Sequence, residues 1–271
     1  MTLVERQPLR HPLRLLVLVG GGLALVAVVG VCLFVWLGLF DVAATTGHSW
    51  PVAMLLHYTM ERSVAVRAGD PPVPNLSDPR LIMRGGAHYA SGCAPCHGAP
   101  GELASPIAQG MTPVPPGLYS AGRQFTPAEL FWIVKHGVKM TAMPAWPAQE
   151  RSDEIWAMVA FLRALPGYTT PAYAALTGWS GASFLQPSAA PSGFDPASCA
   201  RCHGADGRGR DGAFPDIAGL DIATFVAALH GYRDGSRPSG FMQPVAAALS
   251  DEAMGEAANY YAALPRQAGS L

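Results

Sequence analysis

Two five-residue motifs in this chain combine cysteine and histidine at a spacing that suits one kind of chemistry. They are Cys93-Ala-Pro-Cys96-His97 and Cys199-Ala-Arg-Cys202-His203. Two thiols three positions apart can reach the two vinyl groups on one edge of a porphyrin, and the adjacent imidazole can bind its iron. Zinc sites and redox dithiols are the alternatives, but neither needs histidine at that position. The two motifs therefore predict two covalently bound c-type haems.

Several side chains could occupy the sixth coordination position of each iron. Methionine or histidine there closes the site and supports electron transfer, whereas an open position admits a substrate. In the second half of the chain the candidates are Met242 and Met254, and Met254 falls in an expected helix, where methionine usually packs in the core. The candidates in the first half are Met143, Met140, Met111, His88 and His136.

An apolar run near the N-terminus predicts a membrane anchor. Leu15 to Phe40 is 26 residues without a charged side chain, which as a helix is about 39 Å long and can cross a bilayer with some tilt. A cleaved signal peptide is the alternative, but its apolar core is about 7 to 15 residues long and ends at a small-residue site that this run lacks. Cys32 is expected to face lipid as a small apolar residue.

The charges beside this run predict its orientation. Arg6, Arg10 and Arg14 precede it, whereas Asp41 follows it and no Lys or Arg occurs before Arg62. The positive-inside rule then places the N-terminus in the cytoplasm and everything from Asp41 onward on the other side of the membrane.

Residues 50–68 predict an amphipathic helix after the anchor. Ser49 is its expected N-cap, and Pro51 lies in its first turn. Trp50 and Tyr58 suit a membrane interface, so the helix either lies on the membrane as a stalk or packs on the domain that follows. His57 within it is expected to be a surface or packed side chain rather than a ligand.

Helical periodicity and helix-start signals predict two all-α modules. Expected helices span 80–96, 126–136 and 152–165 in the first module, and 222–230 and 250–264 in the second. Most of the charge-free stretch between the modules is predicted as linker. The expected organisation is a cytoplasmic N-terminus (1–14), a transmembrane anchor (15–40), a stalk helix and Pro-rich spacer (41–77), domain one (78–166), a linker (167–192), domain two (193–265) and a C-terminal tail (266–271).

The segment from His136 to Trp146 closely resembles the methionine loop of class I cytochromes c, in which the methionine followed by proline is a ligand. The segment from Arg233 to Glu252 is similar to the second half of cytochrome c4. The overall plan is similar to membrane-anchored dihaem cytochromes, including the dihaem subunit of cbb3-type oxidases. These resemblances imply class I cytochrome c domains and two iron ligand pairs, His97 with Met143 and His203 with Met242.

The same resemblance implies two further features. Bacteria attach haem c outside the cytoplasmic membrane, which agrees with the predicted export of both modules. A backbone carbonyl near a proline also accepts the N–H of the iron-binding histidine in class I cytochromes, which fixes its tautomer. Pro115 or Pro116 in the first module, and Pro215 in the second, are the candidates.

These observations favour a dihaem electron carrier of the bacterial inner membrane with periplasmic haem domains. Its expected partners are the lipid bilayer and respiratory redox proteins: a quinol-oxidising complex or dehydrogenase on one side, and a terminal oxidase or soluble cytochrome on the other. No nucleic acid is expected. Residues 80–166 hold seven Lys or Arg against five Asp or Glu, and residues 193–271 hold six against nine, so the domains are expected to dock different partners. The alternative is a dihaem redox enzyme of the peroxidase or thiosulfate-oxidising type, which needs an open haem or another ligand set.

Overall fold

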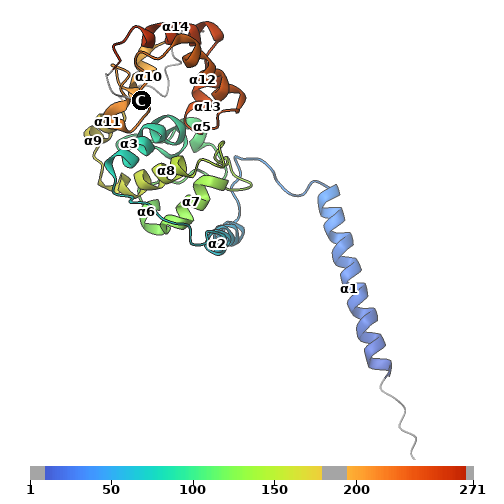
Figure 1. Ribbon diagram of the computed structural model, residues 1–271. Helices are drawn as coiled ribbons and strands as arrows, with labels where there is room; N and C mark the ends of the chain where they lie inside the picture. Colours follow the sequence, from blue (N-terminus) through green and yellow to red (C-terminus); the bar gives the residue numbers. More distant parts are fainter. Residues whose placement is uncertain (1–9, 179–193, 267–271) are drawn as a thin grey trace, which may run out of the picture. The chain divides into compact units, whose positions relative to one another are not determined.

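The computed structural model describes residues 10–178 and 194–266, and helices dominate them (Figure 1). Within these ranges there is no β-strand; Ala99 and Glu102 form one isolated antiparallel bridge. The all-α class is therefore confirmed. The chain divides into two compact units, Met1–Thr46 and Gly47–Leu271.

The first unit contains helix α1, Arg10–Trp36. Its segment Arg14–Trp36 is the one helix in the described part of the chain that is long and apolar enough to cross a membrane. The helix ends four residues before the expected end of the anchor at Phe40. Gly38 and Leu39 donate backbone hydrogen bonds to Val35 and Phe34, which is the pattern of a Schellman motif and closes the helix there.

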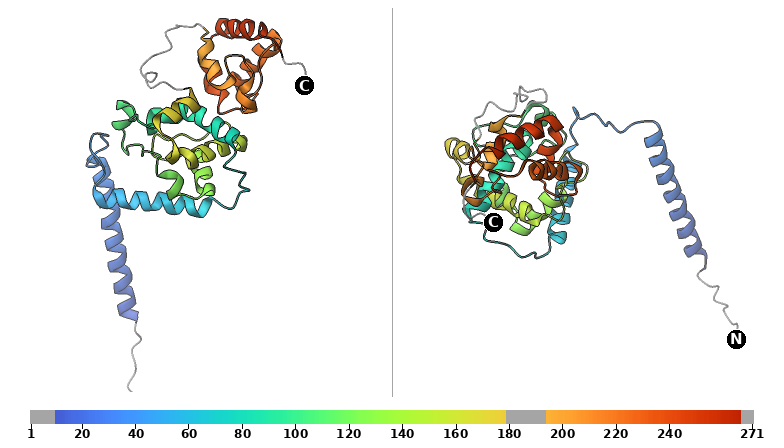
Figure 2. Two further views of the ribbon diagram at one scale, coloured as in Figure 1. Left: turned by 90° about the vertical axis from the view of Figure 1, so that its left-hand side faces the viewer. Right: turned by 45° about the horizontal axis from the view of Figure 1, so that its top comes forward.

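The second unit begins with helix α2, Trp50–Arg67, with Pro51 in its first turn as expected. The C-terminal half of α2 packs against the domain that follows: Val64 is buried, and Gln124 donates a 3.0 Å hydrogen bond to Glu61. Its N-terminal half stays exposed, including Trp50. In Figures 1 and 2, α2 lies at the end of this unit opposite the C-terminal helices. Packing on the domain, one of the two expected placements, is thus what the C-terminal half of α2 shows.

The next helices surround α8, which spans Ser152–Ala164 and is buried from Glu154 to Leu162. It packs on α3, α6 and α7. The elements of this group, besides α8, are α3 (Pro79–His88), the π-helical turn η1 (Tyr89–Cys93), α4 (Ala94–His97), α5 (Pro106–Gln109), α6 (Ala121–Gln124), α7 (Pro127–His136) and the 3₁₀ turn η2 (Leu165–Gly167).

The helix expected over 80–96 is divided into three pieces, α3, η1 and α4. Pro95 has no N–H and cannot continue the i→i−4 ladder. The chain instead widens into η1, where the amide of Ala94 bonds to the carbonyl of Tyr89, five residues back. A π-type turn of this kind is common beside functional sites. Here it ends at Cys93.

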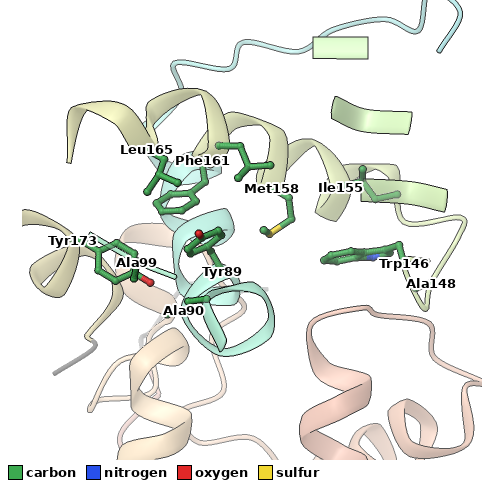
Figure 3. Packing of buried hydrophobic residues seen from close by; sticks show 12 residues of the cluster. Tyr89, Ala90, Ala99, Trp146, Ala148, Ile155, Met158, Phe161, Leu165 and Tyr173 are labelled. Atoms are coloured by element: carbon green, nitrogen blue, oxygen red, sulfur yellow. The ribbon is translucent and has the colours of Figure 1, made fainter. Parts of the chain in front are cut away.

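A cluster of buried aromatic and apolar side chains forms the core of this group (Figure 3). Phe161 on α8 lies 5.0 Å from Tyr89 and 6.2 Å from Tyr173 between ring centroids. Tyr89 also donates a 2.7 Å hydrogen bond to the carbonyl of Gly98. The core therefore ties the segment around the first motif to α8.

The prediction of linker over 167–192 is wrong for its first part. Residues Thr170–Thr177 form helix α9, which packs on α3 and buries Tyr173 in the core. Thr169 caps the helix by accepting the N–H of Ala172, and Gly178 ends it. The absence of charge, typical of linkers, here accompanies a short helix that has its own cap and buries only Tyr173 and Thr177. Residues 179–193 lie outside the described residues, as do 1–9 and 267–271.

The C-terminal helices have a core of their own, built around Phe225, Met254 and Tyr261. Two start at caps close to the expected positions: Asp221 accepts the N–H of Thr224, and Ser250 accepts that of Ala253. The elements are α10 (Pro196–His203), α11 (Gly209–Gly212), α12 (Ile222–Asp234), α13 (Met242–Ala248) and α14 (Asp251–Ala262).

Candidate haem sites

The four motif cysteines are unpaired thiols on two helical segments. Cys93 ends η1 and packs against the first core cluster, and Cys199 on α10 packs against the second. Burial raises the pKa of Cys93 to about 12 and that of Cys202 to about 11, so these thiols are neutral at pH 7. Each pair is therefore free to form thioether bonds.

Both motif histidines make the same contact with a backbone carbonyl. Nδ1 of His97 lies 2.8 Å from the carbonyl oxygen of Pro116, and Nδ1 of His203 lies 2.9 Å from that of Pro215. A carbonyl can only accept, so Nδ1 carries the proton and Nε2 keeps its lone pair. The expected carbonyl partners are confirmed, with Pro116 rather than Pro115 in the first site.

The environment of each imidazole favours its neutral form. Burial lowers the pKa of His97 and of His203, and the hydrogen bonds to Pro116 and Pro215 oppose this effect only in part. A neutral imidazole with a free Nε2 is the form that binds iron.

Met143 lies in the loop between α7 and α8, half-buried. Two hydrogen bonds hold the backbone of Met143 in this loop. Thr141 Oγ1 accepts the N–H of Met143 at 3.1 Å, and the Met143 carbonyl accepts the N–H of Val138 at 3.2 Å. Three residues later, Trp146 is buried in the core cluster that also contacts Cys93. The loop that carries Met143 is thereby fixed to the core beside the first motif.

Met242 is the first residue of α13 and packs against the second core cluster, as does Cys199. The structure thus brings a motif cysteine and the candidate methionine to one apolar cluster. Arg233 on α12 holds the far end of α13, donating to the carbonyl of Leu249 at 2.5 Å and pairing with Asp251 at 2.5 Å. The position of Met242 is therefore supported from both ends of its helix.

Two rival methionines lie in unsuitable places. Met140 is 91% exposed, with a backbone φ of 64°. Met254 is completely buried on α14, and a guanidinium nitrogen of Arg233 lies 3.5 Å from its sulfur. Met111 is half-buried in the bend after α5. Core packing of Met254, expected from its place in a helix, agrees with this position.

The two rival histidines lie in different environments, one exposed and one packed against aromatic rings. His136 is exposed at the end of α7, 5.0 Å from Trp132 between ring centroids. His88, at the end of α3, packs against the rings of Trp146 (5.0 Å) and Phe241 (4.7 Å). Burial lowers the pKa of His88 to about 4.

A cavity of about 280 Å³ borders His97 and is lined by Tyr89, Leu118 and Leu165 among others. The cavity leaves space for a bound group beside the neutral imidazole of His97, and its lining includes the polar residues Glu102 and Gln109. In the part of the chain that the structure describes, no group of three or more His, Cys, Asp or Glu side chains is placed to hold a metal ion. The residues present therefore fit a covalently bound haem.

Several residues without a predicted role connect the two candidate sites. Trp146 lies in the loop of Met143 and Phe241 directly precedes α13, and their rings meet at 5.6 Å between centroids. Glu154 was interpreted only as a helix-start signal, yet it is buried. No signal in the sequence marks these contacts, because they join segments that are 85 residues or more apart in the chain.

Comparisons with known proteins agree with this chemistry. The family model described as cytochrome c oxidase, cbb3-type, subunit III matches residues 80–162. A thiosulfate dehydrogenase electron acceptor of Stutzerimonas stutzeri (strain A1501) is 46% identical over 76 residues, which are 27% of this chain and 35% of that protein. The chain thus spans about a third of the length of this relative. No solved structure matched the chain.

A second relative is covered over most of its length. Cytochrome c-554(548) of Halomonas halodenitrificans (strain ATCC 12084 / NCIMB 8669) is 37% identical over 67 residues, 24% of this chain and 81% of that protein. This match, the geometry of the motif cysteines and histidines, and the family match all point to the same class of protein. The chain belongs to the c-type cytochromes, electron-transfer proteins that bind haem covalently.

Proposed function

We propose that this chain is a membrane-anchored dihaem cytochrome that passes single electrons between redox proteins on the periplasmic side of the bacterial inner membrane. The observation that best supports a second haem is that both motif histidines have the same hydrogen-bond geometry. His203 contacts a proline carbonyl at 2.9 Å, as His97 does at 2.8 Å, although the family match covers only the first motif.

In this proposal each protein group has a separate task. Cys93 and Cys96 hold the first haem by thioether bonds, and Cys199 and Cys202 hold the second. His97 and His203 bind the irons through Nε2, while Met143 and Met242 close the sixth positions. A bound haem supplies an iron that changes between its ferrous and ferric forms, and a His/Met ligand pair favours a relatively high reduction potential.

The proposed membrane attachment rests on α1 and on the free half of α2. From Arg14 to Trp36 the side chains of α1 are exposed, and most are apolar. The first nine residues of α2 are also exposed, including Trp50, Leu55 and Tyr58, and aromatic residues of this kind favour the membrane interface. The arginines before the apolar run support a cytoplasmic N-terminus.

The proposed partners follow from the two domain charges and from the first relative. The name of the Stutzerimonas protein states that it accepts electrons from thiosulfate dehydrogenase. By analogy, a periplasmic dehydrogenase is a suitable donor here, and a quinol-oxidising complex is the alternative. The acceptor is a terminal oxidase or a soluble cytochrome, within a respiratory chain.

The haem content tests the proposal directly. We expect two haems per chain that remain bound in acidic organic solvent, because thioether bonds hold them. Replacing Cys199 and Cys202 together by serine should leave one, and Cys32→Ser is the matched control that should leave two. A wild-type count of one would refute the dihaem assignment.

The methionine ligands are tested by the weak far-red absorption band of sulfur bound to ferric haem. Met143→Ala and Met242→Ala should each remove about half of this band and allow carbon monoxide to bind one reduced haem. Met140→Ala should remove none of it, because Met140 is exposed. Carbon monoxide binding by the unmutated protein would instead mean that one site is open.

A further inference from the structure

Glu154 is a buried carboxylate at the contact between the two groups of helices. It lies in the first turn of α8, and its side chain is only 1% exposed. Two of its four partners come from its own helical group: a guanidinium nitrogen of Arg151 forms an ion pair with it at 3.1 Å, and the indole nitrogen of Trp146 donates a hydrogen bond at 3.2 Å. A buried carboxylate keeps its charge only when donors surround it in this way.

The other two donors come from the C-terminal group. The hydroxyl of Ser239 donates to Oε1 of Glu154 at 2.6 Å, and the amide N–H of Gly240 donates to Oε2 at 2.6 Å. A carboxylate has about four lone-pair positions, and each group of helices supplies half of the four donors here. Arg151 adds a direct link by donating to the carbonyl of Pro238 at 2.9 Å.

These contacts continue to Met242. The amide N–H of Met242 donates to Ser239 Oγ at 3.1 Å, so the hydroxyl that binds Glu154 also fixes the first residue of α13. A side chain at Gly240 would place a Cβ 2.2 Å from the Trp146 indole nitrogen, so this close approach requires glycine. One carboxylate thus connects the loop of Met143, through Trp146, with the start of the helix that carries Met242.

Ring contacts enclose the same junction. Phe241, next to Met242, packs against the first core cluster, where its ring contacts those of His88 and Trp146, which also contact each other. The guanidinium carbon of Arg84 lies 5.9 Å from the centre of the Phe241 ring. Phe241 is therefore an apolar anchor inserted from one domain into the other, beside the Glu154 network.

We propose that Glu154 is a positioning residue for the second haem site: a side chain of the first domain that holds Met242 of the second in the place needed for iron ligation. The inference rests on the proposed function, in which Met242 is the sixth ligand. It makes the ligation of one haem depend on a residue outside the domain that binds it.

The test isolates the second site by using Met143→Ala as the background, in which only the methionine of the second site can give the far-red band. In this background Glu154→Ala should remove most of the remaining band and increase carbon monoxide binding to the second haem. Glu154→Gln should also weaken it, since an amide offers one acceptor oxygen in place of two. The matched control is Glu150→Gln, which changes an exposed carboxylate four residues before Glu154 and should leave the band unchanged.

Ser239→Ala provides a second variant that cuts the link to Met242 and leaves the Glu154 to Trp146 bond intact. It should shift the midpoint potential of the second haem downward and leave that of the first unchanged, which a general loss of stability would not do. A retained band and an unshifted potential in both Glu154→Ala and Ser239→Ala would overturn the inference. A Met143→Ala protein without any far-red band would instead refute the ligand assignment itself.

Discussion

The depressed pKa of His88 predicts a defined loss of stability in acid. Burial lowers the pKa of its imidazole from 6.5 to about 4 in the folded protein. Below pH 6.5 the unfolded chain binds a proton at this position, whereas the folded chain stays neutral until about pH 4. The stabilising effect of a neutral His88 is therefore complete above pH 6.5 and is lost progressively as the pH falls toward 4.

The size of this effect follows from the shift. A difference of about 2.5 pKa units corresponds to roughly 3.4 kcal/mol when the transition is complete, and about 2.5 kcal/mol of it is lost by pH 4.5. His88→Phe keeps an aromatic ring in contact with Trp146 and Phe241, but the new side chain cannot be protonated. The variant should therefore lose about 2.5 kcal/mol less stability than the wild type between pH 7 and pH 4.5.

Urea unfolding of the detergent-solubilised protein, followed by circular dichroism at both pH values, measures this difference. His97 and His203 are present in both proteins, so their contributions cancel in the comparison. The matched control is His48→Phe, at an exposed position, and it should retain the full pH dependence of the wild type. Equal acid destabilisation of His88→Phe and wild type would show that His88 is not a buried neutral group.

Three further substitutions test how the sites are supported, each by denaturant unfolding with the haem spectrum as a second readout. Tyr89→Phe removes the 2.7 Å bond to the Gly98 carbonyl and should cost about 1 to 3 kcal/mol; no change would mean that the carbonyl finds another donor. Arg233→Met removes the donor of the Leu249 carbonyl and the ion pair with Asp251, which should lower the free energy of unfolding by about 2 kcal/mol and weaken the far-red band of the second haem. An unaltered band would mean that these contacts do not determine the position of Met242. Thr126→Ala removes the capping box with Glu129 and should cost about 1 kcal/mol without any spectral change, and a spectral change would contradict a purely local role.

Local signals in the sequence predicted most of the helices. The capping box of Thr126 and Glu129 marks the start of α7, and Ser250 marks the start of α14, because side-chain caps act on amides only two or three residues away. The proline carbonyls beside the two histidines were also expected, but from the family resemblance. Spacing alone did not decide between Pro115 and Pro116, since that choice depends on how the loop folds.

The parts that sequence did not predict depend on distant contacts. Helix α9 has a composition typical of linkers, and it is the burial of Tyr173 beside Tyr89 and Phe161 that stabilises it. Glu154 has the position of an ordinary acidic residue in a first helical turn, where exposure is the usual outcome. Only the fold places Ser239 and Gly240 against it, 85 and 86 residues further along the chain.

The chemistry at Glu154 also explains why the two domains would stay together. Separation would take two of its four donors away and expose Phe241 to water. A carboxylate that loses partners while it remains largely buried is costly, and exposing an aromatic side chain adds to this cost. Both effects therefore oppose separation of the two domains. A fixed contact keeps the loop of Met143 and the start of α13 at a constant separation, as electron transfer between the two proposed haems would require.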